Sequence, residues 1–146
     1  MATPRIETLI AFYQTLSRQS VAQISSLYAD DAYFKDPFNE VRGVPAIERI
    51  FAHMFDQVDE PHFSISERLV DQHGALLVWS FSFWPRGWRC SQAQVVRGVT
   101  HLKFDAAGRV AWHRDYWDAA EELYAKLPVI GWLTRRLKKS LSAFRG

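Results

Sequence analysis

The sequence predicts an α+β domain in which a cone-shaped, curved antiparallel sheet wraps around N-terminal helices, with an amphipathic helix at the C-terminus. Apolar residues recur at helical spacing up to about residue 55, alternate with polar residues between about 63 and 117, and return to helical spacing from residue 130. Helices segregated from a meander of strands are typical of α+β domains. A strongly curved sheet around helices would enclose one deep apolar pocket.

Three helices are expected in the first part of the chain. Residues 4–16 begin with a proline, which suits a first helical turn, and continue with apolar residues at helical spacing. Ser20 opens a capping-box pattern that predicts a second helix over 20–28. A short strand is expected over 32–38, and a third helix over 45–55.

The second part of the chain has the period of two that predicts strands. Four strands are expected, separated by glycine- and proline-containing turns, over residues 63–69, 76–84, 94–104 and 109–117. A second capping box at Asp118 predicts a helix to about residue 127. We therefore divide the chain into a cone domain over 1–127 and a basic amphipathic helix over 128–146.

Composition narrows the class of protein. The 146 residues suit one domain, and six Trp and ten Phe exceed the need of a minimal core. Some of these rings should therefore line a cavity or an exposed patch. The single cysteine, Cys90, excludes an internal disulfide and fits a reducing compartment. The sequence shows neither a signal-peptide pattern nor an 18-residue apolar span, so a cytoplasmic location is expected. If the C-terminal tail binds a membrane, the protein would be a peripheral membrane protein.

The positive charge is concentrated in the tail. Five of the 18 cations and none of the 16 acids follow residue 131, so the preceding part carries 13 cations and a net charge of −3. A nucleic-acid partner is not expected for such a domain. Residues 130–146 combine this charge with an apolar stripe, which suits either a helix docked on the domain or in a dimer, or a helix that meets an anionic membrane.

Three groups of residues are candidates for a functional site, each with a second interpretation. Asp36 ends the first strand before Pro37, and is either a general base in an apolar pocket or a turn-forming residue. His113 and Asp115 share one strand face. They are either an acid–base pair, or a polar pair in the cavity mouth or a buried ion pair with an arginine such as Arg114 or Arg97.

The third group forms one face of the most apolar strand. It is an aromatic wall for a flat or lipid-like ligand, or ordinary core, and consists of Trp79, Phe81 and Phe83. The sequence has no Cys/His metal pattern and no glycine-rich phosphate loop. We therefore predict no metal and no cofactor, since a base and an oxyanion hole suffice for proton abstraction beside a carbonyl.

Two segments carry a resemblance to a known family. Residues 28–38 read Tyr-Ala-Asp-Asp-Ala-Tyr-Phe-Lys-Asp-Pro-Phe, and residues 108–118 read Gly-Arg-Val-Ala-Trp-His-Arg-Asp-Tyr-Trp-Asp. With the helix after Gly43, they resemble the nuclear transport factor 2-like superfamily, the cone fold of ketosteroid isomerase, limonene epoxide hydrolase and SnoaL-like polyketide cyclases. The resemblance covers about residues 5–127 and implies a homodimer through the open sheet face. It does not single out one reaction, because the fold hosts many.

Similarity to ketosteroid isomerase implies a set of catalytic roles. Asp36 matches the base, Tyr13 the oxyanion-hole donor and Tyr28 its neighbour. Thr100 stands where the isomerase has a protonated acid, and Phe51 where it has a supporting tyrosine. Because losing one oxyanion donor costs about 100–1000-fold in rate, the resemblance predicts weakened proton transfer.

Similarity to limonene epoxide hydrolase is partial. Asp115 matches a strand-end carboxylate, but Phe81 and Phe83 replace the arginine and aspartate of its catalytic triad, so that reaction is not expected. The resemblance therefore predicts a pocket protein for a small hydrophobic molecule, or an isomerase- or cyclase-like enzyme with Asp36 as base. The alternative is a non-catalytic lipid carrier or a protein- or membrane-interaction module.

Overall fold

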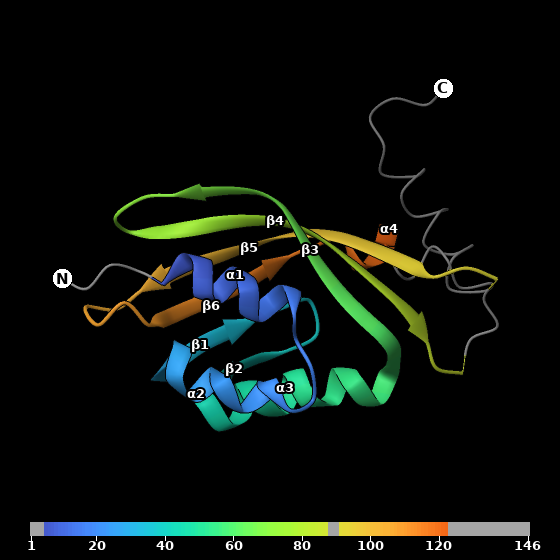
Figure 1. The fold of residues 1–146 in the computed structure, drawn as a ribbon, viewed down its shortest axis with the longest axis horizontal. Helices are drawn as coiled ribbons and strands as arrows, with labels where there is room; N and C mark the ends of the chain where they lie inside the picture. Colours follow the sequence, from blue (N-terminus) through green and yellow to red (C-terminus); the bar gives the residue numbers. More distant parts are fainter. Residues whose placement is uncertain (1–4, 88–90, 123–146) are drawn as a thin grey trace.

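A computed structural model of the chain describes residues 5–87 and 91–122. Three N-terminal helices pack on one face of a curved six-stranded sheet (Figure 1). The elements, with η1 a 3₁₀ turn, are α1 Ile6–Gln14, η1 Ser20–Gln23, α2 Ile24–Leu27, β1 Tyr28–Lys35, β2 Glu40–Arg42, α3 Val44–Gln57, β3 Val58–Val70, β4 Gly74–Pro85, β5 Gln94–Phe104, β6 Val110–Tyr116 and α4 Ala119–Glu122. The predicted α+β class is confirmed.

The sheet is mixed, with the strand order β2-β1-β6-β5-β4-β3. Strands β3 to β6 form the predicted antiparallel meander, but β1 pairs with β6 in parallel. The expectation of a wholly antiparallel sheet is therefore wrong in this one pairing. The pairing joins segments separated by the whole meander, and local periodicity contains no information about it.

The chain around β1 differs from the prediction. The second helix is only a 3₁₀ turn and one α-helical turn, and Tyr28 begins a strand instead of ending a helix. Asp30 and Asp31 therefore lie in β1, although the predicted helix over 20–28 and strand over 32–38 leave them between the two elements. The three-residue strand β2 was not predicted, because so short and polar a segment has no periodicity to detect.

Helix α3 positions one wall of the site. It begins after Gly43, whose φ of 101° is costly for residues with a Cβ, and it has a proline in its first turn as expected. Its buried residues recur at helical spacing and pack in the main core; they are Val44, Ile47, Phe51 and Phe55. Strand β3 follows without a loop, and in Figure 1 it bends away from α3 across the edge of the sheet.

The predicted basic amphipathic helix over 128–146 lies outside the described residues. Within the described part of the chain, no helix has both the length and the apolar character that crossing a bilayer requires.

Candidate functional site

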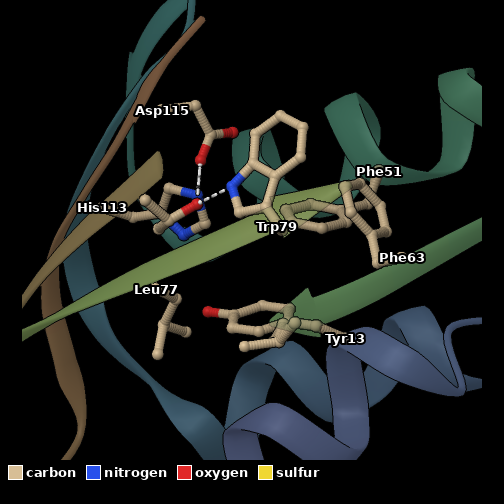
Figure 2. Close-up of a pocket in the computed structure, with 9 residues that line it drawn as sticks. Tyr13, Phe51, Phe63, Leu77, Trp79, His113 and Asp115 are labelled. Atoms are coloured by element: carbon tan, nitrogen blue, oxygen red, sulfur yellow. Dashed lines mark hydrogen bonds and ion pairs between the residues drawn. The ribbon is translucent and has the colours of Figure 1, made fainter. Parts of the chain in front are cut away.

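A cavity lies between helices α1 and α3 and the inner face of the sheet (Figure 2). It contains about 40 Å³ of space that the centre of a water molecule can occupy. Nine residues line it: Tyr13, Phe51, Phe63, Ile65, Leu77, Trp79, Thr100, His113 and Asp115. Since one buried water needs roughly 10–15 Å³, the cavity has room for a few waters or for a small organic group.

The polar side of the cavity is built by two paired strands. Thr100 on β5 lies opposite Asp115 on β6, and strand alternation places His113 on the same face as Asp115. The Thr100 hydroxyl donates to Asp115 Oδ1 at 2.5 Å, and His113 Nε2 lies 2.8 Å from the same oxygen. Trp79 on β4 donates its indole N–H to Thr100 Oγ1 at 2.8 Å. The Asp115 carboxylate is thus held from two sides.

Two tyrosines extend this hydrogen-bond network beyond His113. Tyr28, at the start of β1, has its hydroxyl 2.7 Å from His113 Nδ1 and 2.6 Å from the hydroxyl of Tyr13 on α1. An unbroken path therefore runs from Tyr13 through Tyr28 and His113 to Asp115. In Figure 2 the Tyr13 ring extends from α1 toward the sheet, so both ends of this path border the same cavity.

Burial determines the charge state of the tyrosines. Loss of hydration raises the pKa of Tyr13 and of Tyr28 well above the usual value, and the nearby Asp115 adds to both shifts. Both phenols are therefore neutral over the physiological pH range. His113, only 3% exposed, is enclosed by rings that include Phe34 at 4.7 Å and Tyr28 at 5.9 Å between centroids.

Asp36 does not line the cavity. Its Oδ1 accepts the backbone N–H of Phe38 at 2.8 Å and that of Asn39 at 2.6 Å, so the carboxylate closes its own loop after β1. This corrects the expected placement and agrees with the second interpretation, a turn-forming aspartate before a proline. The sequence could not distinguish the pocket interpretation from the turn interpretation, because the choice depends on whether the backbone of Asn39 returns to contact the Asp36 carboxylate.

The aromatic strand is divided between the cavity and the core. Two of the expected ligand-binding residues, Trp79 and Phe51, line the cavity. Phe81 and Phe83 share the face of Trp79 but stack with each other beyond the lining, at 5.1 Å between centroids. Three lining residues were not singled out from the sequence: Phe63, Ile65 and Leu77. Alternation along β3 and β4 was the available signal, since it places them on the inner face.

No metal centre is evident in the part of the chain that the structure describes, where no three His, Cys, Asp or Glu side chains are grouped to hold an ion. The chemistry that the lining residues themselves can perform is hydrogen bonding and proton transfer around Asp115.

Comparison with known proteins agrees with this architecture. A protein of ketosteroid isomerase-like fold from Catenulispora acidiphila, described in complex with trimethylamine, is 17% identical with a TM-score of 0.70, over 87% of this chain and 96% of that one. An NTF2-like protein of unknown function from Burkholderia pseudomallei is 15% identical with a TM-score of 0.68, over 80% and 92% of the two chains. An LEH-like epoxide hydrolase of M. tuberculosis is 16% identical with a TM-score of 0.64, over 90% and 92%.

These likenesses concern the fold alone, and no curated protein sequence matches the chain. The family model of the SnoaL-like domain matches residues 9–113, which include most of α1, all of α2 and α3, strands β1 to β5 and part of β6. The chain therefore belongs to the SnoaL-like domain family.

Proposed function

We propose that this protein binds a small organic molecule in the cavity, and that Asp115 accepts a proton from it. The observation that carries the proposal is the state of this carboxylate. Among the described residues it is the one carboxylate that lines the cavity, and its side chain is 19% exposed. Oδ1 is held by Thr100 and His113, whereas Oδ2 has no hydrogen bond from the described residues. A positioned carboxylate with one open oxygen suits a general base.

The proton would pass from a C–H or N–H bond of the ligand to Oδ2. The ligand keeps the electron pair, and the proton later returns to the same or a neighbouring atom, as in an isomerisation. His113 and Thr100 keep Asp115 oriented and do not themselves touch the proton. In this proposal Asp115 takes the role of base that the sequence suggested for Asp36. Thr100, which stands where the isomerase has a protonated acid, is a positioning residue.

The family supports a small-molecule function in general terms. The Catenulispora protein described with trimethylamine shares the fold, so a ligand of that size is compatible with this architecture. The second candidate is a non-catalytic carrier. It is favoured by the hydroxyls of Tyr13 and Thr100, because both already take part in hydrogen bonds with protein groups and neither is free to stabilise an oxyanion.

Hydrogen exchange tests the base directly. Wild-type protein is incubated in D₂O with small carbon acids (acetone, nitroethane and aminoacetone), and loss of the C–H signal is followed by proton NMR. We expect faster exchange of at least one of them, and a decrease of about 100–10,000-fold in the enzymatic rate in Asp115→Asn. Asp36→Asn is the matched control and should exchange like the wild type.

Two outcomes would count against Asp115. Loss of exchange in Asp36→Asn with retention in Asp115→Asn would refute the assignment. Binding of the carbon acids without any acceleration would exclude the base and leave the carrier.

A further inference from the structure

On the polar side of the cavity, the indole N–H and the hydroxyl hydrogen are donated to protein groups. An indole N–H can only donate, so Trp79 gives its hydrogen to Thr100, 2.8 Å away. The Thr100 hydroxyl in turn uses its one hydrogen on Asp115 Oδ1. Both donors of this branch are therefore occupied, and neither can reach a ligand.

The hydrogen bonds that reach Asp115 through His113 are also donated toward Asp115. Asp115 Oδ1 accepts the Thr100 hydrogen and also lies within hydrogen-bond distance of His113 Nε2, and a carboxylate can only accept. His113 Nε2 therefore carries the hydrogen, and in a neutral imidazole Nδ1 is then the acceptor. Nδ1 takes the hydrogen of Tyr28, so the 2.6 Å bond between the two tyrosines is donated by Tyr13.

Among the described residues, this arrangement leaves only acceptors at the cavity surface. The ligand meets the open oxygen of Asp115, the lone pairs of Tyr13, and the rings of Trp79, Phe51 and Phe63. A carbonyl or anionic ligand finds no donor among the described lining residues and faces a negative charge. An ammonium group finds a counter-charge, hydrogen-bond acceptors and aromatic rings that attract cations.

We infer that the cavity selects a small organic cation, a short alkylammonium, with its charge toward Asp115. This inference rests on the proposed function, because it assigns a ligand class to the same cavity and the same carboxylate.

Two probes of equal size separate charge from shape. Trimethylammonium chloride and acetone have the same number of non-hydrogen atoms, but only the first is cationic and only the second is purely an acceptor. Titration calorimetry at pH 7 should show at least tenfold tighter binding of trimethylammonium to the wild type. Asp115→Asn should lose at least tenfold of that affinity, while Asp36→Asn, which alters net charge equally, should retain it.

The outcomes distinguish this inference from the proposed function. Equal or tighter binding of acetone would overturn the cation inference and leave a neutral ligand for Asp115 to act on. Binding of neither probe to folded wild-type protein would overturn both. If Asp115→Asn does not fold, NMR of the wild type provides the test. The indole N–H resonance of Trp79, assigned by its loss in Trp79→Phe, should shift on addition of trimethylammonium and should not shift with acetone.

Discussion

Gly98 on β5 supports the cavity from behind Trp79. A Cβ at this position would lie 2.6 Å from Cζ2 and 2.7 Å from Cη2 of the Trp79 ring, and 2.9 Å from the backbone oxygen of Tyr116. All three distances are shorter than real Cβ contacts allow, so Gly98→Ala must move the indole or the strand. Trp79 is 6% exposed, and its N–H is bound to Thr100, so it has little room to move.

The expected cost of Gly98→Ala follows from these contacts. Overpacking a buried site costs about 1–3 kcal/mol. Displacing the indole also weakens the hydrogen bond to Thr100, which contributes about 1 kcal/mol. We therefore expect the free energy of unfolding to decrease by about 2–4 kcal/mol, measured by urea denaturation followed by circular dichroism.

A second background tests the cause. Phenylalanine lacks the second ring of tryptophan, which contains both clashing carbons, so Gly98→Ala should cost at least about 1 kcal/mol less in Trp79→Phe than in the wild type. The remaining cost comes from the Tyr116 oxygen. A loss below about 0.5 kcal/mol in the wild type, or an equal loss in both backgrounds, would refute the steric reasoning.

Two further predictions concern the tyrosines. Tyr28→Phe removes the hydroxyl between Tyr13 and His113, and should lower the free energy of unfolding by about 2 kcal/mol because buried polar groups lose their partner. Tyr33→Phe, whose hydroxyl bonds Glu40 at the surface, is the control, and an equally large effect there would contradict the argument. Because burial raises the pKa of Tyr13 and Tyr28, the unfolded chain ionises first near pH 10, so their stabilising contribution is complete below that pH and decreases above it. Above pH 10 the free energy of unfolding should fall with a slope approaching about 1.4 kcal/mol per pH unit for each tyrosine. Tyr13→Phe removes one of the two groups and should therefore make this slope less steep, and an unchanged slope would exclude this titration.

The candidate site was predictable where strand alternation decides it. His113 and Asp115 are two residues apart, so they share a face whatever the rest of the chain does. Tyr13, Tyr28 and Thr100 were proposed only through the family resemblance, and the structure brings them to the same hydrogen-bond network as His113 and Asp115. The role of Asp36 was not predictable, because the same Asp-Pro pair suits a pocket and a turn.

By itself, the sequence determined the α+β class, the order of the longer helices and of the four meander strands, and which residues share one face of β4 and of β6. These properties depend on the spacing of residues only a few positions apart. Tertiary structure alone decided the parallel pairing of β1 with β6, the small volume of the cavity and the path from Tyr13 to Asp115. The bond from Tyr28 to His113 joins residues 85 positions apart, and such contacts exist only when the sheet has brought distant segments together.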